Sequence, residues 1–292
     1  MGQVYEQFLG KVIRLTAGHR AVIDDKPEVK KAGGVYYTPT YIVDYIVRHT
    51  VGELVEDNTP AEVAKLRVLD PACGSGSFLI GAYQFLLDWH LAWYLRNEPT
   101  KWAKGRRQAL IQTGTTWRLT IAERKRILID NIYGVDIDPQ AVEVTKLSLL
   151  LKVLEGETDQ TLQPLLFGLH ERALPDLGDN IKCGNSLIGS DFYRQGELPL
   201  LNEDERQRIN VFDWDGKEGF PEIMNSGGFD AVIENPPYIF TRELLSNAER
   251  SYFSNSYSLS LEKHNTYFLF MEAQLRLLRR SGRGSYIVPN SW

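Results

Sequence analysis

Few residues of this 292-residue chain suit disulfide or metal chemistry. It has only two cysteines, Cys73 and Cys183, too few for a disulfide framework or a cysteine-based zinc cage. The five histidines are scattered, without the spacing of metal ligands or an evident nucleophile partner. We therefore expect no metal, and the low cysteine usage favours a reducing cytosol.

Long apolar runs and an excess of charge of one sign are also missing. No run is long enough to cross a bilayer, and the first residues carry Glu6 and Lys11 where a signal segment would be apolar. The 33 Lys and Arg residues face 38 Asp and Glu, a formal net charge of -5, which excludes a general coat for polyanions. With 43% apolar and 24% charged residues, the composition is that of an ordinary soluble globular protein, and together with the low cysteine usage we expect a cytoplasmic location.

Short runs rich in β-branched residues alternate with longer helical patterns, which is typical of an α/β fold. The strand patterns cover residues 66–69, 131–135, 180–183, 229–233 and 284–288. Apolar residues at spacings of three and four predict helices over residues 41–55, 76–95, 139–154 and 262–278. Thr38 and Pro39 match a helix start before residue 41, and the chain before them has a weak helical pattern. We expect one sheet flanked by helices.

Charge is unevenly distributed along the chain. Residues 96–126 contain nine basic and two acidic residues, whereas residues 191–222 contain nine acidic and four basic ones. Runs of this kind are more often solvated surface insertions than binding sites, and we interpret both in this way. The basic insertion remains available for contacts with phosphates.

The first motif is the end of a predicted strand followed by a glycine turn, with the sequence DPACGSGSF at residues 70–78. Gly74 and Gly76 let the backbone turn tightly and approach a ligand, while the helix that follows offers unpaired N–H groups. Such a turn binds nucleotide-like ligands at the carboxyl end of a strand. The third glycine of the dinucleotide fingerprint is missing, and Asp70 would repel a pyrophosphate but attract an ammonium or sulfonium group. The motif therefore favours S-adenosylmethionine over NAD.

A second motif, VDIDP at residues 135–139, follows another predicted strand. A carboxylate at the end of the second strand of such a fold accepts both hydrogen bonds of a ribose diol, and Asp136 is the candidate. Asp138 is better explained as the N-terminal cap of the helix that begins at Pro139. The basic insertion lengthens the usual gap of about 20 residues between glycine turn and acid, but the order of the parts is kept.

The third motif, NPPY at residues 235–238, is an abrupt turn after a strand. Pro236 and Pro237 donate no N–H group and fix their own φ, so the turn presents carbonyl oxygens without competing donors. The Asn235 side-chain oxygen and the Pro236 carbonyl can together accept the two N–H groups of an exocyclic amino group on a base. Tyr238 can stack on the face of that base. A plainer interpretation is a proline turn with a half-buried aromatic.

In this order, the three motifs resemble those of the N-6 adenine-specific DNA methyltransferases of the gamma arrangement, particularly the methyltransferase region of type IIG restriction-modification enzymes. The similarity spans residues 33–292. It implies a Rossmann-like sheet that binds S-adenosylmethionine. The catalytic residues that it implies are Asn235, Pro236, Pro237 and Tyr238. The cofactor-binding residues that it implies are Thr38, Asp70, Ala72, Gly74, Gly76, Phe78, Asp136, Ile137, Asn185 and Phe270.

Three of these assignments come from matches outside the three motifs. Thr38, in the sequence YYTP, is implied to hold the methionine end of the cofactor. Asn185 stands where the family usually has Asp against the cofactor adenine, and its side-chain oxygen can accept the same bond. Phe270 is placed near the same adenine, and it fits a plain core position equally well.

The resemblance implies direct transfer of the sulfonium methyl group to the amino nitrogen of an adenine flipped out of double-stranded DNA, without a metal or covalent enzyme intermediate. It implies the modification part of a prokaryotic restriction-modification or phage-defence system. We expect an N-terminal helical segment at residues 1–60 and a methyltransferase domain at residues 61–292 that ends before the family's target-recognition domain. Binding to DNA should then be weak.

Other functions remain open. The chain could bind the cofactor and be catalytically inactive by itself. Methyltransferases that act on protein glutamine or on guanine in RNA share an acceptor turn of the NPPY type. The Tyr-Thr-Pro sequence at residues 37–39 and the glycine turn favour adenine in DNA over these two substrates.

Overall fold

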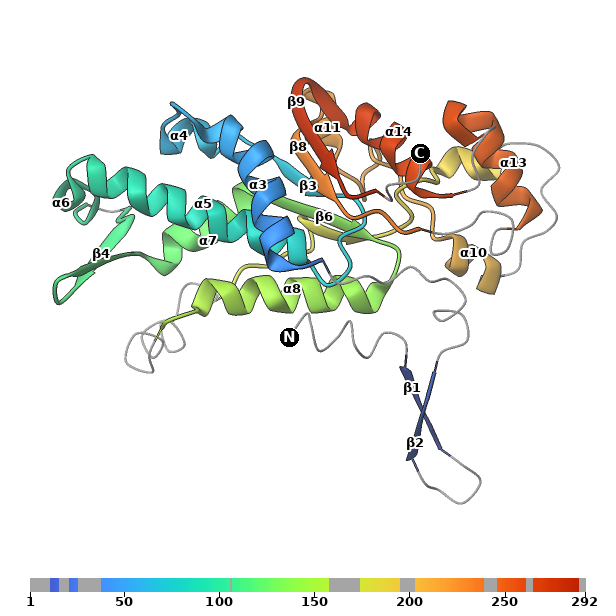
Figure 1. Ribbon diagram of the computed structural model, residues 1–292, viewed down its shortest axis with the longest axis horizontal. Helices are drawn as coiled ribbons and strands as arrows, with labels where there is room; N and C mark the ends of the chain where they lie inside the picture. The colour runs from blue at the N-terminus through green and yellow to red at the C-terminus, as the bar shows by residue number, and fades with distance from the viewer. Residues whose placement is uncertain are drawn as a thin grey trace.

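A sheet of five parallel strands lies at the centre of the computed structural model, which describes residues 11–15, 21–25, 38–105, 107–157, 174–194, 203–238, 246–260 and 265–288. The strands are β3 (Val68–Asp70), β6 (Ile132–Asp136), β7 (Ile181–Cys183), β8 (Phe229–Glu234) and β9 (Leu278–Tyr286). Their order across the sheet is β7-β6-β3-β8-β9 (Figure 1). The prediction of an α/β fold with one parallel sheet is confirmed.

The strand order reverses direction between β3 and β8. From β3 the chain moves outward to β6 and β7, and it then returns to the other side of β3 to add β8 and β9. Leu69 of β3 pairs with Tyr133 on one side and with Val232 on the other. Open parallel sheets bind ligands beyond the carboxyl ends of their strands at such a reversal. A ligand site is therefore expected where β3, β6 and β8 end.

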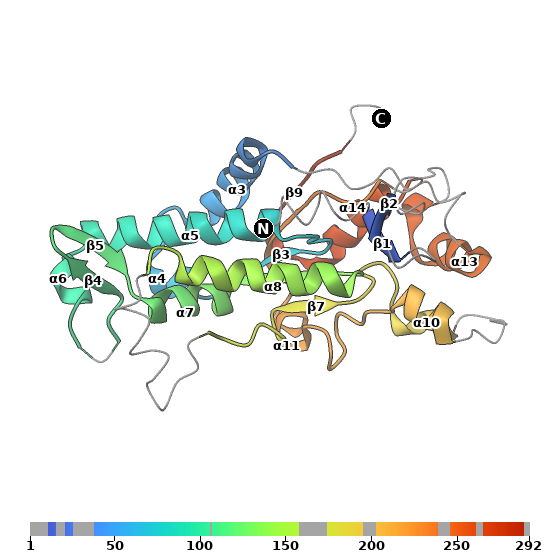
Figure 2. The ribbon, with the colours of Figure 1, turned by 90° about the horizontal axis from the view of Figure 1, so that it is seen from below.

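Helices cover both faces of the sheet. One face carries α3 (Thr40–Val55), α5 (Ser77–Arg96), α7 (Ile121–Asn131) and α8 (Pro139–Leu154). The other face carries α11 (Pro221–Asn225) and α14 (Tyr267–Leu277). Apolar side chains recur every three to four residues, as Leu79, Tyr83 and Leu86 do in α5, and these pack into the larger core. Figure 2 shows α5 and α8 side by side beneath the sheet.

The remaining elements are short. They are α4 (Pro60–Val63), α6 (Pro99–Trp102), the hairpin of β4 (Leu110–Thr113) and β5 (Thr116–Leu119), the 3-10 helices η1 (Ser190–Arg194) and η2 (Ser258–Ser260), α10 (Glu203–Ile209), α13 (Asn247–Ser256) and the pair β1 (Lys11–Leu15) and β2 (Ala21–Asp25). η1, α10, α13 and α14 share a second, smaller core that includes Phe192, Tyr252 and Phe270. This smaller core lies next to the glycine turn, because Ala72 packs against it.

Most predicted elements are confirmed with small shifts. α8 spans the predicted residues, and α3 and α5 begin and end within one residue of the prediction. β9 differs most, since it begins at Leu278 rather than at residue 284. Residues 278–283 carry three arginines and lack the apolar alternation of a strand, because this edge of the sheet leaves most of their side chains partly or fully exposed.

Two expectations near the N-terminus are wrong. Thr38 does not cap α3: the capping residue is Pro39, whose carbonyl accepts from the N–H groups of Ile42 and Val43, while the Thr38 hydroxyl accepts from the Asn235 amide. The weak helical pattern before residue 38 is also corrected for the part that is described, since β1 and β2 pair as antiparallel strands. Both strands contain adjacent Val and Ile residues, which favour strand over helix.

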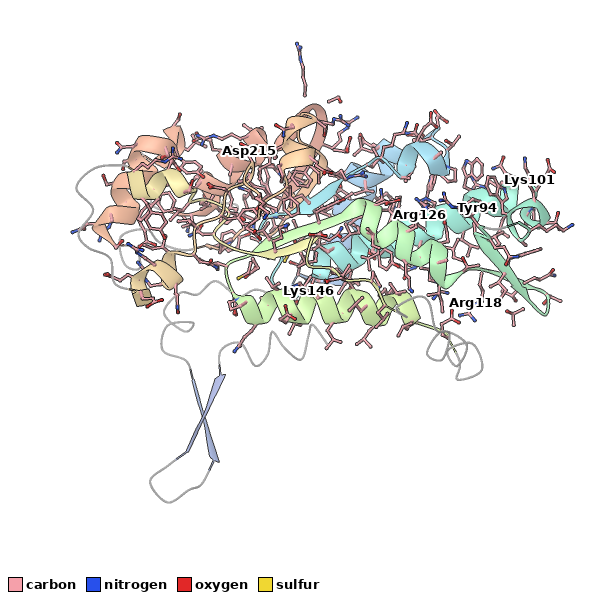
Figure 3. All side chains as sticks on the ribbon, turned by 180° about the vertical axis from the view of Figure 1, so that it is seen from behind. Tyr94, Lys101, Arg118, Arg126, Lys146 and Asp215 are labelled. Carbon is pink, nitrogen blue, oxygen red and sulfur yellow. The ribbon has the colours of Figure 1, made fainter. Side chains whose placement is uncertain are left out.

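The basic insertion is only partly a solvated surface. Arg124 is 9% exposed and donates to the carbonyls of Val153 and Glu155, and Arg126 pairs with Glu123 at 2.7 Å. Figure 3 shows Arg126 near Tyr94 of α5, and Arg118 lower down near the end of α8, where it donates to the Gly156 carbonyl at 2.6 Å. These arginines join α7 and β5 to their neighbours, so that part of the interpretation is wrong. The exposed cations of the insertion within the described residues include Arg96, Lys101, Lys104 and Arg107.

No helix in the described parts of the chain combines the length and apolar character needed to span a membrane.

The larger core gives a direct test of the packing. Leu79 is 0% exposed, so Leu79→Ala should lower the free energy of unfolding by about 2–5 kcal/mol, through lost burial and the cavity left behind. Leu275→Ala is a matched control, because Leu275 is 73% exposed and its loss should change stability by about 0.5 kcal/mol at most. Urea denaturation measures both. Equal losses in the two variants would contradict the assigned core.

Candidate active site

Three acidic residues close the carboxyl ends of the three central strands. Asp70 ends β3, Asp136 ends β6 and Glu234 ends β8. Asp70 is 2% exposed and Glu234 is 0% exposed. Negative charges at the ends of neighbouring strands repel one another when they are buried away from water. The arrangement therefore favours protonated carboxyl groups or a bound cation. The strand reversal between β3 and β8, where a ligand site is expected, therefore holds a group of acidic side chains.

The glycine turn between β3 and α5 has the two positive-φ positions that its sequence predicts. Gly74 has φ +52° and Gly76 has φ +84°. A Cβ atom at Gly76 would lie 2.9 Å from Thr145, so packing requires glycine there, whereas a Cβ atom at Gly74 would meet nothing within 4 Å. The Thr145 hydroxyl donates to the Gly74 carbonyl at 2.8 Å. α8 thus fixes the turn from one side and leaves the backbone of Gly74 open on the other.

Asp136 holds the glycine turn from the neighbouring strand. Its Oδ2 accepts from the Gly74 N–H at 2.8 Å, and its Oδ1 accepts from the Asp138 N–H at 2.9 Å. Each oxygen keeps a further acceptor position, which is what a ribose diol requires. Burial raises the pKa of this carboxyl. Asp138 caps α8 by accepting from the Gln140 N–H at 2.9 Å, which confirms its predicted structural role.

The Asp70 carboxyl group is almost completely buried. Its Oδ1 accepts from the Ala72 N–H at 3.0 Å. Burial, with a smaller contribution from the charge of Asp136, raises the pKa of Asp70 to about 8. The free protein therefore holds Asp70 mostly protonated at neutral pH, and an approaching cation would favour its ionised form.

The residues of the NPPY turn are hydrogen-bonded to two segments that lie far from the turn in sequence. The Asn235 Nδ2 donates to the Thr38 hydroxyl at 3.1 Å, and the Tyr238 hydroxyl lies 2.9 Å from Asn235 Oδ1 and 2.8 Å from the Ile287 carbonyl. Thr38 comes from the start of α3, and Ile287 follows β9. The structure thus joins Thr38 to the NPPY turn by a direct hydrogen bond, and the cofactor contact implied for Thr38 stays a prediction.

The prolines of the turn are held from α14. Pro236 follows Asn235 directly, and the carbonyl of Pro237 accepts from the Thr266 hydroxyl at 2.5 Å. The ring of Tyr238 meets that of Tyr267 edge to face, with centroids 5.9 Å apart. Tyr238 therefore has its hydroxyl directed at Asn235 and its ring supported from α14. Its role as a stacking platform stays a prediction.

The other implied cofactor residues occupy different environments. Asn185 Oδ1 accepts from the Leu187 N–H at 3.0 Å and keeps one acceptor position. Ile137 is 47% exposed beside Asp136. Phe270 is 7% exposed in the smaller core, and Ala72 packs against the same core. Phe78 is 3% exposed in the larger core.

The prediction from sequence missed Glu234. It ends an otherwise apolar strand, FDAVIE, directly before Asn235, and a charged residue at the inner end of a central strand was the available signal. Groups of three or more His, Cys, Asp or Glu residues arranged to hold a metal ion are absent from the described residues.

Two family models cover the chain. The model of the N-6 DNA methylases matches residues 1–165, and that of the Eco57I restriction-modification methylases matches residues 130–292. The chain belongs to this family of N-6 DNA methylases. The family inferred from the three motifs is thereby confirmed, and both models overlap on the strand that ends at Asp136.

Curated proteins and solved structures are similar to this N-6 DNA methylase. The type II restriction enzyme and methyltransferase RM.Eco57I of Escherichia coli is 32% identical over 99% of the chain, which spans 26% of that protein. The adenine-specific methyltransferase PglX of Streptomyces coelicolor is 25% identical over 75% of the chain, which spans 16% of it. A structure of the ATP-dependent type ISP restriction-modification enzyme LlaBIII bound to DNA covers 88% of the chain and 15% of its own length, at 15% identity and a TM-score of 0.48.

Proposed function

We propose that the chain transfers the methyl group of S-adenosylmethionine to the exocyclic amino group of adenine in double-stranded DNA, as the modification part of a restriction-modification or phage-defence system. The observation that carries this proposal is the hydrogen-bonded set of Thr38, Asn235 and Tyr238 at the sheet edge that also holds the glycine turn and Asp136. Family membership supports the same chemistry.

The residues at this edge fit the cofactor. Gly74 leaves room for a ligand against its backbone, because a Cβ atom there would meet nothing within 4 Å. Asp136 retains acceptor positions for the ribose, and Asp70 lies where the positively charged methionine end would follow. Asn185 retains one acceptor position for an adenine amino group. When bound, S-adenosylmethionine supplies a methyl group activated by the sulfonium charge.

Asn235 and Pro236 position the amino group of the target base. The Asn235 side-chain oxygen and the Pro236 carbonyl accept its two N–H groups, which turns the nitrogen lone pair toward the methyl group. Thr38 accepts from Asn235 Nδ2 and so fixes which end of the amide faces the base. A strong base is unnecessary before transfer, because the methylated nitrogen becomes cationic and acidic.

The Tyr238 hydroxyl binds the same Asn235 oxygen that would accept from the base amino group. In the free protein its hydroxyl is shared between Asn235 Oδ1 and the Ile287 carbonyl. A base amino group that takes the Asn235 acceptor leaves the Tyr238 hydroxyl a second partner at 2.8 Å. The Tyr238 hydroxyl therefore stays hydrogen-bonded when the base binds to Asn235, so base binding costs little free energy at this hydroxyl.

Tyr238 should act on base binding through its ring rather than its hydroxyl. We expect Tyr238→Ala to raise the KM for DNA by about tenfold or more, since stacking on an aromatic ring contributes about 1–3 kcal/mol per base. Tyr238→Phe keeps the ring and removes only the hydroxyl, so its KM should stay within about threefold of the unmodified chain. Steady-state methylation kinetics measure both. An equal defect in the two variants would contradict stacking.

Within the described residues, most arginines of the cluster on α14 and β9 are paired with acids. Arg276 pairs with Glu272, Arg279 with Asp230 and Arg283 with Glu53, whereas Arg280 is exposed. The exposed cations at the α6 end lie at the far end of α5, a helix of 20 residues and thus about 30 Å long, from the glycine turn (Figure 1). This supports the expectation of weak DNA binding, since affinity depends on phosphate neutralisation.

One assay separates the candidate functions. The chain is incubated with S-adenosylmethionine labelled in its methyl group and with plasmid DNA, bulk RNA or a glutamine-bearing protein. Label in N-6-methyladenine of DNA is the expected result. Label in guanine of RNA or in glutamine would assign one of the alternatives. Calorimetric binding of the cofactor with no label in any substrate would identify a cofactor-binding polypeptide that is inactive by itself.

A further inference from the structure

Glu234 is a buried acid without a partner. It is 0% exposed, and both of its carboxyl oxygens lack a hydrogen-bond partner within the described residues. Buried polar groups are nearly always hydrogen-bonded, because their desolvation is otherwise uncompensated. Its position at the end of β8, directly before Asn235, places this acid at the edge of the candidate active site. An unsatisfied carboxyl group in such a place indicates that a ligand completes it.

The nearest interacting charges are also acidic. Asp70, at the end of the neighbouring strand β3, acts on Glu234, and Asp136 of β6 acts in turn on Asp70. Burial, and then the charge of Asp70, raises the pKa of Glu234 well above its usual value. The free site therefore carries protons in place of negative charge, and a bound cation could replace a proton there.

The other elements against β8 bring no compensating cation to Glu234 within the described residues. α3 exposes all of its charged side chains to solvent, namely Asp44, Arg48, His49 and Glu53. On α14, Glu272 pairs with Arg276, and the nearby titratable group is Tyr267, whose pKa is raised by burial. On β9, Tyr286 is paired in register with Glu234, Arg279 and Arg283 bind Asp230 and Glu53, and Arg280 is exposed to solvent. The glycine turn adds Cys73, whose pKa burial raises.

We propose that Glu234 and Asp70 together form a subsite for the α-ammonium group of S-adenosylmethionine, and that binding of this group displaces one proton from the pair. The inference rests on the proposed function, because it takes that cofactor as the ligand. The ammonium group has three N–H donors, and the two carboxyl groups supply the acceptors for them. The charge balances, since one positive charge enters the subsite and one proton leaves to the solvent.

Cofactor affinity should consequently depend on pH. In the free protein the pKa of Asp70 is about 8, so below that pH the binding reaction releases a proton. Affinity then rises with pH, by up to about tenfold per pH unit, and levels off above about pH 8. At pH 7 the unmodified chain should release about one proton per cofactor bound.

Three ligands together separate the contribution of the ammonium group to binding from that of the sulfonium group. S-adenosylmethionine has both the sulfonium and the ammonium group, S-adenosylhomocysteine has only the ammonium group, and methylthioadenosine has neither. Calorimetry at pH 7 gives the affinity of each for the unmodified chain and for Glu234→Gln, which conserves volume. We expect the substitution to weaken S-adenosylmethionine and S-adenosylhomocysteine by about tenfold or more, and to leave methylthioadenosine unchanged. Unchanged methylthioadenosine binding also shows that the variant is folded.

Proton release is measured in the same titrations, repeated in two buffers that differ in ionisation enthalpy. The unmodified chain should release about one proton with S-adenosylmethionine and none with methylthioadenosine. Glu222→Gln is the matched control, because Glu222 is exposed on α11 and its loss should alter none of these values.

Several outcomes would overturn the subsite. They are an equal S-adenosylmethionine affinity in Glu234→Gln and the unmodified chain, an equal loss for all three ligands, a loss for S-adenosylmethionine alone, and binding without proton release. An equal loss for all three ligands would indicate a structural role of Glu234. A loss for S-adenosylmethionine alone would indicate a contact with the sulfonium group. If the binding results follow the expectation and no DNA is methylated, the proposed function fails while the subsite stands.

Discussion

Replacing Asn235 by alanine should lower the rate of methyl transfer by on the order of 10³-fold, while S-adenosylmethionine binds within about threefold of its affinity for the unmodified chain. In the proposed mechanism the Asn235 side chain accepts from the base amino group, and Thr38 holds that side chain in place. Alanine removes the acceptor and leaves Pro236 alone against a group with two N–H donors. Asp70 and Asp136 lie at the ends of β3 and β6, so their hydrogen bonds remain, and Thr38 loses only its bond to the amide.

Single-turnover transfer of labelled methyl groups to DNA measures the first quantity, and calorimetry measures the second. Asn225→Ala serves as the control, because Asn225 is an exposed amide at the end of α11 and its loss should change neither. A transfer rate for Asn235→Ala close to that of the unmodified chain would rule out this residue as the acceptor. A parallel loss of cofactor binding would show that it supports the fold instead.

Replacing Asp136 by alanine should weaken S-adenosylmethionine binding by about 10²-fold. The substitution removes the acceptors proposed for the ribose and also the bonds to the N–H groups of Gly74 and Asp138, so the glycine turn loses its support from β6. Two hydrogen bonds to a charged group account for this magnitude. Asp136→Asn keeps one side-chain oxygen as an acceptor and should lie between the two.

Asp138→Ala is the matched comparison, since Asp138 is an acid two residues away that caps α8. We expect it to lower the free energy of unfolding by about 1 kcal/mol and to leave cofactor affinity within about threefold. Calorimetry and urea denaturation on both variants separate the two roles. Equal cofactor defects in the Asp136 and Asp138 variants would contradict the assignment of the ribose to Asp136.

The parts of the fold that local chemistry determines were predictable from sequence. α8 has an Asp cap followed by Pro at its first position, and its bounds agree with the prediction. The strands before Asp70, Asp136 and Asn235 were identifiable because each is a short apolar run that ends in a turn. The motifs therefore located the sheet edge where the site lies, and the strand order confirmed that edge.

Other features depend on partners that are distant in sequence. The Thr38 hydroxyl has the chemistry of a helix cap, and only the approach of Asn235 gives it another role. The sequence places Arg124 in a basic run that we predicted to be solvated. In the structure its guanidinium is buried and donates to carbonyls at the end of α8. Asp136 was assigned to a ligand, whereas its bond to Gly74 depends on the pairing of β3 with β6. The pattern of residues along the chain does not show which of these distant residues come into contact.

The link from Thr38 through Asn235 and Tyr238 to Ile287 spans nearly the whole described chain. Contacts of such long sequence separation form late in folding, because the loop entropy of the intervening chain must be overcome first. Among the described strands, β9 is also at the edge of the sheet, and edge elements open at lower free energy than the rest of a domain. Catalytic competence should therefore be lost on heating before the sheet melts, so methyl transfer reports on the edge strand and circular dichroism on the core.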